Sequence, residues 1–249
     1  MVTIKSEREL NFMREAGKIV AESLALIEEN IRPGISTGEL DDIIQKYMKK
    51  VGARPSFLGY NGFPAAICTS INDELVHGIP SYSRILEDGD IISVDIGAEY
   101  KGYHGDSAKT FAVGKISETA TNLMRVTEES LIKGIAAAVP GGRLTDISFA
   151  IQTHIESNGM SVVKDYTGHG IGQQMHEDPQ ILNYGPPGRG IKLRPGMALA
   201  IEPMVIVGGY QVKELDDGWT VVSADGSLCA HFEHTIGIYE HGTEILTKK

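Results

Sequence analysis

An internal repeat is the feature that most constrains the fold of this chain of 249 residues. When the sequence is shifted by 107 residues, LEDGDIISVD (86–95) aligns without a gap with LRPGMALAIE (193–202), and two Pro-Gly pairs come into register. Agreement of several segments at one offset indicates a duplication. We therefore expect residues 1–249 to form a single domain of two related halves, about 6–114 and 115–249.

Both halves have the same order of elements, two helices followed by strands. In the first half, capping boxes at Ser6–Glu9 and Ser36–Glu39 each precede apolar residues at helical spacing. Gly52 then supplies a stop signal for the second helix. Segments rich in β-branched residues predict strands between 65 and 113. The second half predicts helices over 118–138 and 145–157, and strands from 198 onward.

The charge balance limits the partners of the chain. Asp and Glu outnumber Lys and Arg by 33 to 23, so there is no cationic excess to bind nucleic acid or an anionic membrane. We expect no DNA and no membrane among its partners, because the sequence also lacks a targeting segment and a long apolar stretch. Cys68 and Cys229 are far apart and form no C-x-x-C pattern, which favours a cytoplasmic location.

The segment VDIGAEYKGYHGD contains two aspartates that a hairpin would bring together. If Lys101-Gly102 forms a two-residue turn, Asp95 faces Ala108 and Asp106 lies one diagonal step away on the same sheet face. Two carboxylates so close raise each other's proton affinity unless a cation lies between them. Alternatively, one aspartate belongs to the turn and the other to the strand surface. The hairpin alone leaves both interpretations open.

Two glutamates of the second half, Glu202 in AIEP and Glu233 in HFEHTIGI, also lie among apolar strand residues. By the repeat, Glu202 is the equivalent of Asp95. Carboxylates amid apolar neighbours are costly unless they are paired or metal-bound. Four such groups would balance two divalent cations, and His169 could add a neutral nitrogen ligand. This oxygen-rich set favours Mn, Fe, Co or Zn in a catalytic two-metal centre over a thiolate-based structural zinc site.

The segment YTGHGIGQQMHEDP (166–179) places two histidines seven positions apart. Taken alone, His169 and His176 are open to three interpretations: two ligands of one metal, two catalytic groups, or ordinary loop residues. The surrounding glycines do not form the G-x-G-x-x-G motif of dinucleotide-binding proteins. We expect them to let the backbone pass close to metals and substrate.

The ordered motifs VDIGAEYKGYHGD, GHGIGQQMHEDP, AIEPMV and FEHT together resemble the type I methionine aminopeptidase family of M24 metallopeptidases, over essentially the whole chain. The resemblance implies an α+β, pita-bread fold, in which two pseudo-symmetric halves of helices and antiparallel strands surround a central dimetal site. It implies that residues 1–249 form one catalytic domain. It also implies a metalloaminopeptidase that hydrolytically removes the N-terminal, initiator methionine from nascent proteins and peptides.

The resemblance implies a role for each polar site residue. Five positions would bind two divalent metal ions: Asp95, Asp106, His169, Glu202 and Glu233. A water bridging the metals would deliver hydroxide to the scissile carbonyl, and Glu202 would serve as general base and acid. His176 would contact the scissile amide and the developing oxyanion, and His77 would hydrogen-bond near the leaving amide. Taken alone, His77 would be a loop residue ahead of a Gly-Ile-Pro turn.

The same resemblance implies a small apolar pocket for the methionine side chain. Its candidate residues, besides His77 and His176, are Phe57, Tyr60, Phe63, Cys68, Met175 and Trp219. For Cys68 and Phe57 the alternative is an ordinary place in the core. The family commonly has Phe at position 175 and Tyr at position 63. Met175 replaces a rigid ring with a flexible side chain, and Phe63 lacks the hydroxyl of tyrosine. Both differences from the family pattern affect the size and selectivity of the pocket.

Two other functional classes share this fold. Aminopeptidase P and prolidase carry the same ligand set but act around proline, usually with an added N-terminal domain. Pita-bread proteins that lost metal ligands serve as binding or chaperone modules, and the complete ligand set disfavours that class here. An enzyme acting on initiator methionine needs access to nascent chains, which implies a transient association with the ribosome, although we identify no ribosome-binding motif. We expect a monomer.

Overall fold

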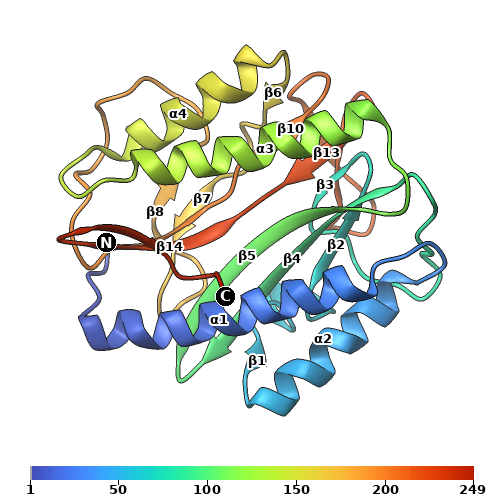
Figure 1. Ribbon diagram of the computed structural model, residues 1–249, viewed down its shortest axis with the longest axis horizontal. Coiled ribbons are helices and arrows are strands. Elements are labelled where there is room, and N and C mark those ends of the chain that lie inside the picture. The colour runs from blue at the N-terminus through green and yellow to red at the C-terminus, as the bar shows by residue number, and fades with distance from the viewer. Residues whose placement is uncertain (1) are drawn as a thin grey trace.

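The structure is a computed structural model that describes residues 2–249, with helices on both sides of antiparallel strands (Figure 1). The helices are α1 (Glu7–Asn30), α2 (Thr37–Val51), α3 (Glu118–Ala137) and α4 (Leu144–Ser157), with a short 3₁₀ turn η1 (Tyr60–Gly62). The first half contains β1 (Arg54–Pro55), β2 (Cys68–Ile71), β3 (Glu74–Val76), β4 (Ile91–Tyr100) and β5 (Tyr103–Ala112). The second half contains β6 (Ser161–Val162), β7 (Gly168–Gly170), β8 (Glu177–Ile181), β9 (Ala198–Ile201), β10 (Met204–Ile206), β11 (Val212–Glu214), β12 (Val221–Ser223), β13 (Cys229–His231), β14 (His234–Tyr239) and β15 (Gly242–Ile245).

The helix ends of the first half follow from local sequence signals. Ser6 and Ser36 are the N-caps of α1 and α2, and each forms a complete capping box with the glutamate three residues later. Gly52 ends α2 in the left-handed conformation, with φ of 73°. The predictions for these helix ends are confirmed.

The two halves repeat the same hydrogen-bonded turn before their second helices. In the first half, the N–H of Gly34 donates to the carbonyl oxygen of Leu86 over 2.8 Å. In the second half, the N–H of Gly141 donates to the carbonyl oxygen of Leu193 over 2.9 Å. Both glycines have left-handed backbone, with φ of 90° and 88°. In each half, this hydrogen bond connects the loop between the two helices with the start of the repeated segment, 86–95 or 193–202.

Each half has its own hydrophobic core. In the first, Val20 of α1 and Ile44 of α2 share a buried cluster with Ile92 of β4. In the second, Leu123 of α3 and Ile147 of α4 share a buried cluster with residues of β9 and β14. The strands form sheets in the orders β1-β4-β2 with β5 paired to β4, β13-β10-β6, β11-β12-β3, and β15-β14-β9-β7-β8, and every pairing is antiparallel.

A pair of strands changes sheet in the middle of the second half. β9 pairs with β14 in one sheet, whereas β10 pairs with β13 in another. Between the β9–β14 pairing and the β10–β13 pairing, Glu202-Pro203 lies opposite Phe232-Glu233. These four residues belong to neither pairing, and the change of sheet occurs at them. The two glutamates are therefore released from regular pairing at the point where the sheets separate.

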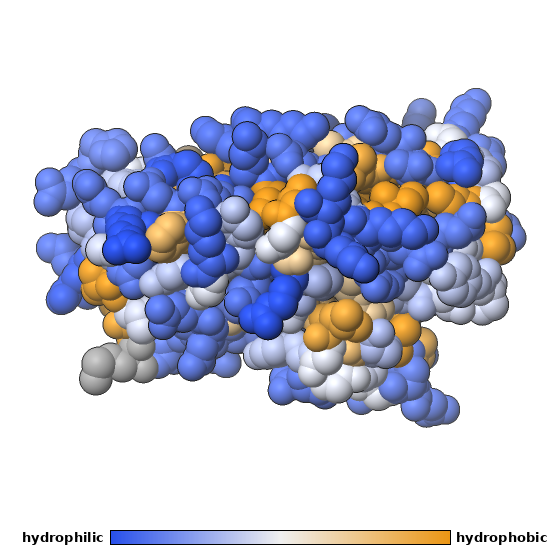
Figure 2. All heavy atoms as spheres, turned by 90° about the horizontal axis from the view of Figure 1, so that it is seen from below, coloured by the Kyte–Doolittle hydropathy of each residue, from blue (hydrophilic) through white to orange (hydrophobic). Residues whose placement is uncertain are grey.

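The surface over α1 and α2 is mostly polar, with apolar side chains in separate patches (Figure 2). Exposed charges on α1 and on the β4–β5 hairpin form ion pairs, such as that between Lys101 and Glu15 at 2.7 Å. None of the helices within residues 2–249 combines the length and apolar character that crossing a membrane requires.

The close approach of α1 to β5 depends on Gly105. A Cβ atom at this position would lie 2.7 Å from the backbone nitrogen of Gly17 in α1. We expect Gly105→Ala to lower the free energy of unfolding by about 3 kcal/mol, because the helix would have to move away from the sheet. Gly52→Ala is the control, since its Cβ would enter open space and only the left-handed backbone penalty of about 1 kcal/mol applies. Urea unfolding of both variants would measure the difference, and equal losses would contradict this account.

Candidate active site

The β4–β5 hairpin places two aspartates on one face of a sheet. Tyr100 pairs with Tyr103, so Lys101-Gly102 is the two-residue turn, and Asp95 faces Ala108 as the sequence predicts. Asp106 pairs with Gly97 and lies diagonally from Asp95. The side chain of Asp106 is buried, with 2% of its surface exposed. The predicted register of the hairpin is confirmed, and the alternative of two separate surface aspartates is excluded.

The two glutamates approach these aspartates from the second half. Glu202 follows β9 and Glu233 precedes β14, so neither lies within a strand as the sequence indicated. The reason is the change of sheet described above, which interrupts both strands at these residues. The N–H of Glu233 donates to the carbonyl oxygen of Ala108 over 2.9 Å, which fixes Glu233 against β5.

His169 in β7 completes the group with a defined tautomer. Its Nδ1 lies 2.9 Å from the carbonyl oxygen of Gly170, which can only accept, so Nδ1 carries the proton. The lone pair of Nε2 then faces the carboxylates, at 3.4 Å from Glu202 Oε1 and 3.8 Å from Asp106 Oδ2. A protonated Nδ1 bound to a carbonyl is the usual support for a metal-ligating imidazole.

Burial makes these carboxylates resist ionisation. Desolvation raises the pKa of Asp106 to about 7. Desolvation, and then the charges of neighbouring carboxylates, raise the pKa values of Asp95, Glu202 and Glu233 well above their ordinary range. Desolvation lowers the pKa of His169 to about 3, so the imidazole is neutral. Without a cation, these groups would hold protons at neutral pH.

Three oxygens of this group are buried without a hydrogen-bond partner among residues 2–249: Asp95 Oδ1, Asp106 Oδ1 and Glu233 Oε1. Buried oxygens of this kind require an explanation in a folded protein. Ligand atoms of Asp106, His169 and Glu233 lie within 4.8 Å of one another. Converging acceptor oxygens and one neutral nitrogen fit a divalent cation, so this group could hold metal.

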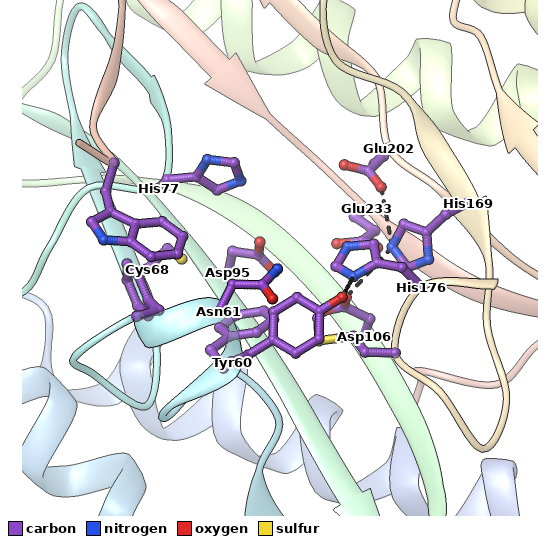
Figure 3. Close-up of a pocket in the computed structure, with 14 residues that line it drawn as sticks. Tyr60, Asn61, Cys68, His77, Asp95, Asp106, His169, His176, Glu202 and Glu233 are labelled. Carbon is purple, nitrogen blue, oxygen red and sulfur yellow. Dashed lines mark hydrogen bonds and ion pairs between the residues drawn. The ribbon is translucent and has the colours of Figure 1, made fainter. Parts of the chain in front are cut away.

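Two further histidines line the same cavity from opposite sides (Figure 3). The Nδ1 of His176 lies 2.9 Å from the hydroxyl of Tyr60, and its ring centroid lies 4.2 Å from that of His169. His77 follows β3 and has a left-handed backbone with φ of 61°. A non-glycine residue in that conformation costs about 1–3 kcal/mol and is often found at functional sites. His77 is thus a loop residue that faces the cavity.

All of the predicted site residues line one cavity of about 370 Å³. Its apolar end is a small cluster in which Phe57, Phe63, Cys68 and Met175 are buried, and Trp219 packs against them. The rings of Phe63 and Trp219 meet edge to face at 5.1 Å between centroids. The polar end is formed by the carboxylates and histidines. The structure thus brings together every residue that the sequence singled out.

The only tryptophan reaches the cavity on an insertion of the second half. β11 and β12 form a hairpin, and β12 also pairs with β3 of the first half. This pairing brings Trp219 to a ring-centroid distance of 6.5 Å from His77. The extra length between Glu202 and Glu233 therefore forms one wall of the site.

Two residues of the site were not predicted from the sequence. Asn61 lines the cavity beside Tyr60. His231 is buried, and its Nε2 lies 3.7 Å from Glu202 Oε2. Its spacing of two residues from Glu233 could have suggested a shared face, because alternate strand residues point the same way.

The glycines of GHGIG make room for protein backbone. A Cβ on Gly168 would lie 2.4 Å from the carbonyl oxygen of Ala200, and one on Gly170 would lie 2.1 Å from that of Asp178. These glycines let β7 approach its neighbouring strands.

Comparison with known proteins identifies the class. Metallopeptidase family M24 matches residues 11–240. This range contains all the carboxylates and histidines described above. The chain belongs to this metallopeptidase family.

Full-length relatives narrow the assignment within the family. Methionine aminopeptidase 1 of Bacillus subtilis is 60% identical over 248 residues, which cover 100% of both chains. Methionine aminopeptidase 1 of Mycobacterium tuberculosis is 48% identical over 99% of this chain and 95% of its own. The crystal structure of methionine aminopeptidase from Thermotoga maritima superposes with a TM-score of 0.98, at 49% identity and 100% coverage of both chains. Within family M24, the chain groups with the methionine aminopeptidases, and the expected pita-bread fold is confirmed.

A prolidase shares the fold more distantly. The structure of prolidase from Pyrococcus horikoshii superposes with a TM-score of 0.78 at 25% identity, and the match covers 99% of this chain but 63% of the prolidase. The lower identity and partial coverage separate this chain from the proline-directed branch.

The pKa of Asp106 makes metal binding sensitive to pH. At about pH 6 this carboxyl, with a pKa of about 7, holds a proton that a metal must displace, whereas His169 is already neutral. We expect affinity for Mn²⁺ or Co²⁺ to fall as pH drops from about 8 to about 6, roughly tenfold per pH unit for each proton displaced. Calorimetric titration in buffers of different ionisation enthalpy would count the released protons. An affinity for these ions that is independent of pH would contradict the prediction.

Proposed function

We propose that this protein is an aminopeptidase that hydrolytically removes the N-terminal methionine of peptides and nascent proteins. The observation that carries the proposal is one cavity with a buried carboxylate and imidazole group at one end and an apolar cluster at the other. The polar end suits hydrolysis of a peptide bond, and the apolar end suits a thioether side chain. Its relatives, named methionine aminopeptidases, support the same reaction.

Two divalent metal ions, Co, Mn, Fe or Zn, would be held by the five predicted ligands: Asp95, Asp106, His169, Glu202 and Glu233. Their unpaired buried oxygens and the Nε2 lone pair of His169 support this assignment. Four carboxylates carry the charge that two divalent ions neutralise. When bound, the ions would acidify a water molecule to form the nucleophile, polarise the scissile carbonyl and bind the free amino terminus.

The protein residues would divide the remaining steps between them. The hydroxyl of Tyr60 fixes Nδ1 of His176, which leaves Nε2 for the scissile amide and the developing oxyanion. His77, on the opposite side of the cavity, would hydrogen-bond near the leaving amide. Glu202, whose pKa is raised by burial, can take a proton on its carboxylate and pass it to the leaving amine.

The side chain of the substrate methionine would lie at the apolar end of the cavity. The pocket residues would be Phe57, Tyr60, Phe63, Cys68, Met175 and Trp219, with His77 and His176 at its boundary. Met175 is flexible and polarizable, so this wall can adapt to the substrate. The buried rings of Phe57 and Phe63 and the partly buried ring of Trp219 form the other side.

We further propose that residues 1–249 act as a single catalytic domain with halves of about 6–114 and 115–249. The repeated turn at Gly34 and Gly141 supports this division. The enzyme would work as a cytoplasmic monomer with transient access to the ribosome, since its substrate is the amino terminus of a nascent chain. The two buried free cysteines agree with a reducing compartment.

Peptide specificity tests the proposal directly. Metal-loaded protein is expected to release free methionine from a Met-Gly peptide and to leave an Xaa-Pro peptide intact, because the cavity offers an apolar site for the first side chain. Amino-acid analysis of both reactions would measure the release. Cleavage of the Xaa-Pro peptide alone would assign the protein to the proline-directed class. Absence of release with every divalent metal tested would assign it to the non-catalytic binding modules.

His176 should be required for catalysis and dispensable for metal binding. We expect His176→Ala to lower kcat/KM by about a hundredfold or more, because a group that contacts the reacting amide is lost. Calorimetry should show that the affinity for Mn²⁺ is retained. Loss of activity and of metal binding together would show that His176 is a ligand.

A further inference from the structure

A buried ion pair connects the amino-terminal residues with the segment that carries His176. The Nζ of Lys5 lies 2.8 Å from Glu177 Oε2, and the two side chains are 5% and 9% exposed. Other Lys and Arg ion pairs within residues 2–249 are more exposed, such as Lys101–Glu15 at 46% and 48%. The hydroxyl of Thr3 also donates to Glu177. Figure 1 shows the chain rising from the start of α1 toward β8, which begins at Glu177.

Glu177 closes the turn that contains Met175 and His176. Its Oε1 accepts the backbone N–H of Gln174 over 3.3 Å, and the N–H of Gly172 donates to the carbonyl oxygen of Gln174 over 3.0 Å. One carboxylate therefore links the turn to the amino-terminal residues through its two oxygens. Since His176 immediately precedes Glu177, displacement of this carboxylate would move the histidine.

Lys5 is itself held rigidly. Its backbone N–H donates to the carbonyl oxygen of Gly196 over 2.7 Å. A Cβ on Gly172 would lie 2.6 Å from Lys5 Cε, so the lysine side chain passes directly against the turn. Burial alone would raise the pKa of Glu177, but hydrogen bonds from Lys5 and Thr3 outweigh it and keep the pKa below its ordinary value. The pair is thus charged and enclosed.

We propose that Lys5 is a positioning residue for His176 and acts through Glu177. This inference rests on the proposed aminopeptidase function, in which His176 contacts the scissile amide. The amino-terminal residues contact the turn 172–177 through Glu177, and neither Lys5 nor Glu177 lines the cavity. Because the reacting groups must be held within a fraction of an ångström, loss of this support lowers the rate of the chemical step.

The test uses the full metal-loaded protein and a Met-Gly peptide. In Lys5→Met, we expect kcat to fall about tenfold to a hundredfold, while KM changes less than about threefold. Lys5→Arg should restore most of the lost kcat, because it returns a cation to Glu177. Affinity for Mn²⁺, measured by calorimetry, should equal that of the wild type, since Lys5 pairs with Glu177 and not with any of the five proposed metal ligands.

Three control variants separate positioning from general loss of stability. Lys5→Met leaves a buried carboxylate unpaired, so the double variant Lys5→Met with Glu177→Met removes both charges and avoids that cost. It should fold and still show the low kcat. Ile147→Ala destabilises the distant core around α4 and should retain kcat at a temperature where it remains folded. Arg125→Ala, which breaks an exposed pair with Glu129 on α3, should behave as the wild type.

The outcomes are distinguishable. A folded, metal-binding double variant with wild-type kcat would overturn the positioning role and leave the proposed function intact. A fall in kcat of Ile147→Ala equal to that of Lys5→Met would also overturn it, because the effect would then follow stability alone. Absence of methionine release by the wild-type protein would overturn the proposed function and this inference with it.

Discussion

The burial of four carboxylates around one imidazole is the constraint on which the rest of the structure depends. Desolvation raises the pKa values of all four, and three of their oxygens have no hydrogen-bond partner among residues 2–249. A fold can keep such groups buried only if its surroundings hold them in place and their charge is either removed by protons or compensated by a cation. The pita-bread architecture meets the first condition by taking two carboxylates from each half, so neither half contains the complete group.

The separation of sheets at Glu202 and Glu233 explains how an interior site remains open. A continuous β9–β10 strand paired with a continuous β13–β14 strand would fill this region with ladder hydrogen bonds and alternating side chains. The interruption frees both glutamates and leaves space for a cavity of about 370 Å³. The β11–β12 insertion then brings Trp219 to close one side, so one segment between the two glutamates determines both the opening and its wall.

The sequence predicts the parts of this structure that depend on local or repeated signals. The capping boxes fix the helix starts, and Lys101-Gly102 fixes the register that places Asp95 and Asp106 on one face. The motifs identify residues that the fold gathers around one cavity. Contacts between distant segments are beyond such reasoning: nothing in the spacing of Lys5 and Glu177 indicates an ion pair across 172 positions. The short strands β7 and β8 were also missed, because glycine and proline in them obscure the alternating pattern.

The segment from His169 to Glu177 contributes three side chains to the cavity because the β7–β8 hairpin reverses the direction of the chain. A bulge between His169 and Gly170 shifts the β7–β8 register, so Gly170 pairs with Glu177 and the intervening turn projects into the cavity. His169 then faces the carboxylates, Met175 the apolar pocket and His176 the hydroxyl of Tyr60. A substitution at Met175 therefore changes the pocket. It leaves His169 and His176 in place only if Glu177 holds the base of the turn. Selectivity and catalysis are separable here to the extent that this base is rigid.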